Sequence, residues 1–106
     1  MAGDPTIERI EKEITSHKVV LFVKGTPEAP QCGFSAATME LFKKLKTPFH
    51  SVNVLTNQEI RSKLPGYSKW PTFPQVFING KLIGGCDLVH QMHESGELEP
   101  LLKASY

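Results

Sequence analysis

A continuous apolar run, Val19–Val23, constrains the fold of this chain more than any other feature. A short run of this kind is typical of a strand buried on both faces, as in a parallel sheet. Residues 33–46 follow with helical spacing, and residues 49–54 then alternate as a second strand. The sequence therefore predicts a βαβ unit. The predicted apolar face of its helix holds Phe34, Ala37, Leu41 and Leu45.

Further helices are predicted on either side of this unit. Residues 4–17 carry one apolar stripe, with Asp4 placed to cap the helix and Pro5 in its first turn. A capping box at residues 56–59 starts another helix, which we expect to end near Pro65.

A β-hairpin is predicted to complete the sheet. Strands at residues 75–78 and 81–83 are separated by an Asn-Gly pair, the strongest two-residue turn signal. Asp87 is expected to cap the next helix, and a last helix runs from residue 97 to about residue 104. The element order α-β-α-β-α-β-β-α-α predicts an α/β fold, with a mixed sheet and helices on both faces.

Size and charge narrow the possible functions. We expect the 106 residues to form a single domain spanning residues 1–106, since 40% hydrophobic content suffices for one core. A net charge of +1 favours neither a general nucleic-acid binder nor a polybasic membrane binder. No apolar run approaches the roughly 18 residues that a membrane span needs.

The cysteines indicate a reducing compartment. Cys32 and Cys86 lie far apart, unlike the dense pattern of small secreted scaffolds, and no zinc-type CxxC pair is present. The acidic N-terminal segment argues against an attached organellar presequence. We therefore expect a cytoplasmic protein. The alternative is the mitochondrial matrix or the plastid stroma, after removal of a presequence.

Cys32 is the candidate reactive residue. It stands where a loop with two prolines turns into the predicted helix, and the N–H groups and dipole at a helix start stabilise a thiolate. Lys24 can add positive charge. Ser35 lies at i+3, where a dithiol enzyme has its second cysteine, so exchange at Cys32 needs an external thiol or Cys86. The alternative is an inert buried thiol, which the Gln, Gly and proline neighbours disfavour.

Three segments together resemble the monothiol glutaredoxins of the CGFS type, in the thioredoxin superfamily. They are residues 32–35 (Cys-Gly-Phe-Ser), 70–75 (Trp-Pro-Thr-Phe-Pro-Gln) and 84–87 (Gly-Gly-Cys-Asp). The resemblance covers nearly the whole chain, with the segments in the right order. It implies a thioredoxin-like fold whose four-stranded mixed sheet has the strand order 2-1-3-4 and is flanked by helices on both faces.

The resemblance also implies a glutathione-binding groove beside Cys32. Lys24 and Arg61 match the basic residues of the family, with Arg61 aimed at the glycyl carboxylate. Lys63 is a less favoured substitute, in part because an Arg fork suits a carboxylate better than a point charge does.

The other contacts implied for glutathione come from two loops. The backbone of Phe73, before a cis Pro74, would pair with the glutathione peptide, and the turn at Cys86 and Asp87 would hold the γ-glutamyl end. Cys86 is expected to contribute mainly its backbone. The alternative is a disulfide between Cys86 and Cys32.

A [2Fe–2S] cluster needs four ligands, which are usually thiolates. One chain offers Cys32 and the thiolate of a bound glutathione, so two chains supply the set. This agrees with the role that the resemblance implies: cluster binding and delivery by a homodimer that is monomeric without the cluster. The implied partners are apoprotein acceptors and a BolA-type protein. The alternative is a glutathione-dependent thiol-disulfide oxidoreductase that acts on mixed disulfides, with at most weak activity.

Overall fold

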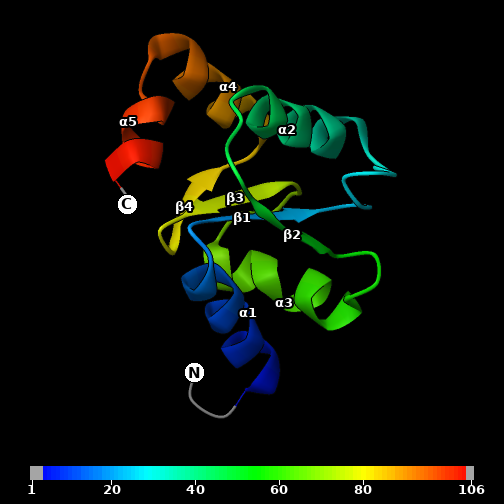
Figure 1. The fold of residues 1–106 in the computed structure, drawn as a ribbon. Helices are drawn as coiled ribbons and strands as arrows, with labels where there is room; N and C mark the ends of the chain where they lie inside the picture. The colour runs from blue at the N-terminus through cyan, green and yellow to red at the C-terminus, as the bar shows by residue number, and fades with distance from the viewer. Residues whose placement is uncertain (1–3, 105–106) are drawn as a thin grey trace.

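The computed structural model describes residues 4–104, and its centre is a four-stranded sheet (Figure 1). The strands are β1 (Val19–Val23), β2 (His50–Asn53), β3 (Gln75–Ile78) and β4 (Lys81–Gly84). Their order is β2-β1-β3-β4, with β1 parallel to β2 and antiparallel to β3. This confirms the predicted strand order 2-1-3-4.

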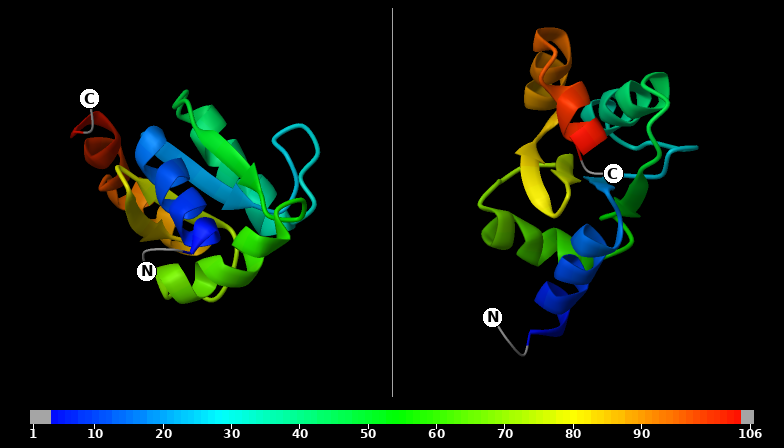
Figure 2. Two further views of the ribbon diagram at one scale, coloured as in Figure 1. Left: turned by 90° about the horizontal axis from the view of Figure 1, so that it is seen from below. Right: turned by 60° about the vertical axis from the view of Figure 1, so that its left-hand side comes forward.

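Helices cover both faces of this sheet (Figures 1 and 2). One face carries α1 (Pro5–Ser16) and α3 (Gln58–Ser68), and the other carries α2 (Gly33–Lys44), α4 (Cys86–Ser95) and α5 (Leu98–Ala104). The predicted order of elements is confirmed. In the part of the chain that the structure describes, each helix is too short or too polar to cross a bilayer.

Strand β1 contributes to two hydrophobic cores. Val19, Leu21 and Val23 belong to the cluster that includes residues of α2, α4 and α5. Val20 and Phe22 belong to the cluster that includes residues of α1 and α3. All five residues are buried, so β1 is apolar throughout because helices cover both faces of the sheet, as predicted.

The start of α1 follows the prediction. The Asp4 carboxylate accepts hydrogen bonds from the backbone N–H groups of Thr6 (2.9 Å) and Ile7 (3.4 Å). Its other oxygen accepts a hydrogen bond from Lys63 Nζ at 2.8 Å, which lowers the pKa of the Asp4 carboxyl. Asp4 therefore both caps α1 and ties it to α3.

Both expected ends of α3 were wrong. Its N-cap is Asn57 rather than Thr56, because the Thr56 hydroxyl donates to the Asn53 carbonyl (3.2 Å) and closes a turn after β2. The helix also continues past Pro65 to Ser68. The packing of Tyr67 against the core supports this extra turn and offsets the hydrogen bond that proline cannot donate.

The predicted inner face of α2 was wrong for Phe34, whereas Leu41 is buried and Leu45 packs against the same core, as predicted. Phe34 is 62% exposed, whereas Ser35 and Thr38 are fully buried. Both buried hydroxyls have partners, since the Thr38 hydroxyl donates to the Phe34 carbonyl (2.9 Å) and the Ser35 hydroxyl accepts from the Lys24 N–H (3.1 Å). Because their hydroxyls have hydrogen-bond partners, two polar side chains can be buried on the inner face of α2, where the sequence pattern predicts apolar side chains.

The predicted cap of α4 needs one correction. Gly85 occupies the N-cap, so Asp87 lies in the first turn and does not cap the helix. In the hairpin before it, Asn79 and Gly80 have φ values of 56° and 79°, as the predicted turn requires.

Candidate functional site

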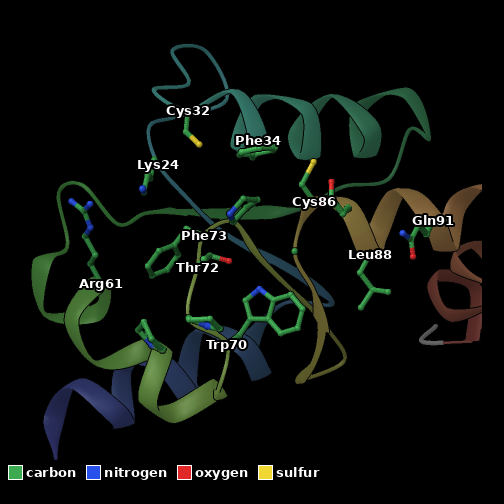
Figure 3. Close-up of a pocket in the computed structure, with 15 residues that line it drawn as sticks. Lys24, Cys32, Phe34, Arg61, Trp70, Thr72, Phe73, Cys86, Leu88 and Gln91 are labelled. Atoms are coloured by element: carbon green, nitrogen blue, oxygen red, sulfur yellow. The ribbon is translucent and has the colours of Figure 1, made fainter.

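A groove of about 830 Å³ lies beside Cys32 (Figure 3). Its walls come from the end of β1, the start of α2, the helix α3, the loop before β3 and the start of α4. All seven residues that the sequence singled out line this groove: Lys24, Cys32, Arg61, Phe73, Pro74, Cys86 and Asp87. Segments from across the chain therefore meet at one surface.

Cys32 is the N-cap of α2 and is half-buried. Figure 3 shows its sulfur directed toward the groove. Desolvation is the largest single influence and raises the pKa of the thiol, whereas hydrogen bonds from the backbone N–H groups of Ser35 and Phe34 lower it. The Ser35 hydroxyl and the charge of Lys24 lower the pKa further, so it lies below its ordinary value. The predicted thiolate-stabilising position is confirmed.

Ser35 has a role of its own beyond the absence of a second thiol at this position. Its hydroxyl is held by the Lys24 N–H and donates a hydrogen bond to the Cys32 thiolate. The sequence indicated only that this position lacks a cysteine. Its burial beneath Cys32 makes it a positioned hydrogen-bond donor.

We expect Ser35→Ala to raise the pKa of Cys32, because the thiolate loses one donor. Alkylation by iodoacetamide, followed against pH, reports the thiolate fraction. The inflection of the rate should move to higher pH, so that alkylation slows below the wild-type inflection while the high-pH plateau stays. Thr38→Val is the matched control, since its buried hydroxyl bonds Phe34 instead. An unchanged profile in Ser35→Ala would contradict this role.

Charge is distributed unevenly along the groove. Figure 3 shows Lys24 and Arg61 toward one end and Cys86, at the start of α4, toward the other. Lys63, the less favoured alternative, does not line the groove, because its ammonium group bonds Asp4 instead. The groove thus offers two cations at one end and a helix N-terminus with Asp87 at the other, which suits a zwitterionic ligand with more than one carboxylate.

The loop before β3 forms the floor of the groove. Its Phe73–Pro74 peptide is cis, as predicted. Gln75 is fully buried, and its side-chain amide donates to the carbonyls of Trp70 (2.8 Å) and Thr72 (3.2 Å). Sequence reasoning missed this supporting role of Gln75, because a glutamine at the start of a strand gives no pattern that predicts burial.

Cys86 lies in the first turn of α4 and is a free thiol, as is Cys32. Its sulfur lies 3.6 Å from Nδ1 of His90, and the same nitrogen is 2.8 Å from the Cys86 carbonyl oxygen. Cys86 also lines the groove, so its backbone can reach a ligand there. The predicted backbone role and the alternative disulfide with Cys32 stay predictions.

The apolar wall of the groove was not predicted in full. It includes three residues that belong to none of the predicted contacts: Phe34, Pro65 and Leu88. Phe34 was assigned to the core, and Pro65 was assigned only to a helix end. Their place on the wall depends on where α2, α3 and α4 begin and end, which sequence patterns locate to within a few residues.

Comparison with known proteins gives a consistent result. The glutaredoxin family profile matches residues 19–83. Glutaredoxin 4 of Haemophilus ducreyi is 47% identical over 98 residues, with 92% of each chain covered. A probable monothiol glutaredoxin 2 of Rickettsia conorii is 50% identical over 104 residues, which cover 98% of this chain and 97% of that protein.

Solved structures agree with these relatives. The reduced apo form of poplar GrxS14 superposes with a TM-score of 0.82 at 47% identity, covering 93% of this chain and 91% of that one. A buckwheat glutaredoxin–glutathione complex superposes with a TM-score of 0.86 at 28% identity, covering 94% of this chain and 89% of that one. The thioredoxin-like fold is therefore shared over nearly the whole chain.

Proposed function

Because this chain belongs to the glutaredoxin family, we propose that it binds a [2Fe–2S] cluster through Cys32 and glutathione and delivers that cluster to apoproteins. The observation that carries the proposal is the Cys32 thiol, whose thiolate form is stabilised, at the edge of a ligand-sized groove. Ser35 stands where an internal second thiol would be, and we propose that the second sulfur comes from a molecule in the groove rather than from Cys86.

Glutathione fits this groove by its chemistry. It carries two carboxylates, one ammonium group and a thiol. Arg61 and Lys24, which line the groove, would bind the glycyl carboxylate, and the backbone of Phe73 would pair with the peptide. The start of α4 can accept the γ-glutamyl carboxylate on its N–H groups and the ammonium on Asp87. The glutathione complex of the buckwheat relative supports this assignment.

Arg61→Gln should weaken glutathione binding about tenfold or more, because one charge-assisted contact is lost. Isothermal titration of the reduced protein with glutathione measures this. Lys63→Gln is the matched control, since Lys63 lies on the same helix but bonds Asp4 outside the groove. Equal affinity in wild type and Arg61→Gln would remove Arg61 from the site.

Two chains are needed to complete the cluster. One chain and one glutathione supply two thiolates, whereas the cluster takes four ligands. The surface next to Cys32 suits a second chain, because the exposed Phe34 lies beside a further hollow lined by Ala37, Cys86 and His90. Burial of Phe34 in the dimer would favour association, and the cluster-free chain would be monomeric.

Since glutathione is held without a covalent bond, the cluster is labile and can be transferred. Apoprotein acceptors, a BolA-type protein as a partner and a cytoplasmic location belong to this proposal. Anaerobic reconstitution with iron, sulfide and glutathione should give a coloured dimer. A colourless monomer would contradict the carrier function.

The lowered pKa of Cys32 favours a second activity, reduction of protein–glutathione mixed disulfides. The Cys32 thiolate would attack the glutathione sulfur and release the protein thiol. A second glutathione thiolate would then attack the glutathionyl Cys32, which regenerates the thiolate and forms oxidised glutathione. We expect slow turnover, as the resemblance to the monothiol glutaredoxins of the CGFS type implies. Brisk turnover without cluster uptake would favour this enzyme over the carrier.

A further inference from the structure

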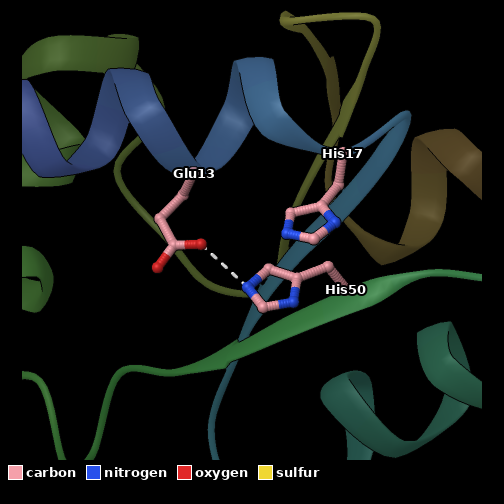
Figure 4. A group of neighbouring side chains, drawn as sticks. All are labelled: Glu13, His17 and His50. Carbon is pink, nitrogen blue, oxygen red and sulfur yellow. Dashed lines mark hydrogen bonds and ion pairs between the residues drawn. The ribbon is translucent and has the colours of Figure 1, made fainter.

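Three side chains that the proposed function does not use lie together (Figure 4). Glu13 is on α1, His17 is the C-cap of that helix, and His50 is the first residue of β2. One potential ligand atom from each lies within 4.8 Å of the other two. Glu13 and His50 are half-buried, and His17 is exposed.

The internal geometry of this cluster is well defined. His50 Nε2 lies 2.8 Å from a Glu13 carboxylate oxygen. The imidazole rings of His17 and His50 are stacked, with centroids 4.0 Å apart and planes 12° from parallel. Figure 4 shows that each ring presents a nitrogen to the side on which the Glu13 carboxylate lies. Two imidazole nitrogens and a carboxylate oxygen therefore converge.

The cluster is separate from the glutathione groove. His50 pairs with Val20 at the start of the parallel β1–β2 ladder, whereas Cys32 follows the other end of β1. None of the three residues lines the groove. A ligand bound here would leave Cys32 and its surroundings untouched.

We propose that Glu13, His17 and His50 bind a divalent first-row transition metal ion of the zinc class, with water in the fourth position. Imidazole nitrogen and carboxylate oxygen are ordinary zinc ligands, and three protein ligands plus water form a common open site. Bonds of about 2.0–2.2 Å would require these atoms to come closer than they are now. The ring of His17 can turn to close this gap because it is exposed.

The backbone around the cluster is held firmly enough to act as a scaffold. Ile10 and Ile14 anchor α1 in the core, on either side of Glu13 in the sequence. Pairing with β1 fixes the position of His50. Only side-chain rotations are then needed to form the site. The metal would replace the Glu13–His50 hydrogen bond, and the bound His50 nitrogen would give up its proton.

The test is a zinc titration of the full chain carrying Cys32→Ser and Cys86→Ser, without glutathione, so that no thiolate competes. Imidazole ¹⁵N shifts identify the ligands. We expect one equivalent of zinc to shift His17 and His50 together and to leave His90 and His93 unchanged. His17→Gln should weaken zinc binding about tenfold or more, since loss of even an outer-shell partner costs that much.

Glu13→Gln should also weaken zinc binding. His93→Gln is the control and should leave zinc binding unchanged, because His93 lies on α4, outside the cluster. Because His17 is exposed, its replacement leaves the fold intact, which a ¹H–¹⁵N spectrum verifies. Three results would each overturn the proposal: zinc binding that does not saturate, shifts centred on His90 and His93, or unchanged zinc affinity in His17→Gln. His17 and His50 would then be a stacked pair of rings that binds no metal. None of these outcomes bears on glutathione or the cluster.

Discussion

Replacing Cys32 by serine is expected to abolish cluster binding and to leave a colourless monomer after anaerobic reconstitution. A serine hydroxyl does not form an anion under conditions in which the Cys32 thiol, with its lowered pKa, does. Each chain would lose its one protein ligand to the proposed cluster. The effect should be complete rather than partial, because two glutathione molecules alone cannot hold the cluster on the protein.

The visible absorption of the cluster and the elution volume in size-exclusion chromatography measure this loss. Glutathione binding should persist in Cys32→Ser, because the groove residues Lys24, Arg61 and Asp87 remain. Cys86→Ser is the matched control, and it should keep both colour and dimer if Cys86 supplies only its backbone. A coloured dimer from Cys32→Ser would remove Cys32 as a ligand, and loss of colour in Cys86→Ser would make Cys86 one.

Gly25→Ala should destabilise the protein by about 2–3 kcal/mol. Gly25 has a φ of +102°, which an alanine adopts only with strain. A Cβ atom there would lie 2.5 Å from the Gln31 nitrogen and 2.7 Å from the Ala29 oxygen. Both are backbone atoms, so the loop itself must move. That loop leads directly into Cys32, so reactivity of the thiol should change as well.

Urea unfolding measures the stability change, and alkylation of Cys32 reports the displacement of the loop. Gly66→Ala is the control. Gly66 lies inside α3, where an added Cβ meets no atom within 4 Å. The free energy of unfolding of this variant should rise by about 0.5–1 kcal/mol, because alanine forms helices better than glycine does. Wild-type stability in Gly25→Ala would show that the loop accommodates the side chain at no cost.

Local patterns were sufficient to predict the frame of the fold. The apolar run at β1 indicated burial on both faces, and the Asn79–Gly80 pair fixed the hairpin. The resemblance carried by residues 32–35, 70–75 and 84–87 then supplied the strand order and a set of site residues that the structure brings to one groove. These features depend on short stretches of sequence, which is why they could be predicted.

Features that depend on tertiary contacts could not be predicted in this way. Burial of Ser35 is tolerated because the Lys24 N–H, from the end of β1, meets its hydroxyl. Phe34, the residue before Ser35 on α2, is exposed and lines the groove instead of the core. His17 and His50 stack only because β2 returns parallel to β1, and no spacing in the sequence indicates their approach.

The composition of the reconstituted complex shows whether two chains and two glutathione molecules share one cluster. Native mass spectrometry under anaerobic conditions should show two chains, one [2Fe–2S] cluster and two glutathione molecules in a single species. Omitting glutathione from the reconstitution should leave the monomer without a cluster. A complete cluster on one chain, or on two chains without glutathione, would contradict binding of the cluster through Cys32 and glutathione in a dimer. A protein that takes up no cluster at all would contradict it as well.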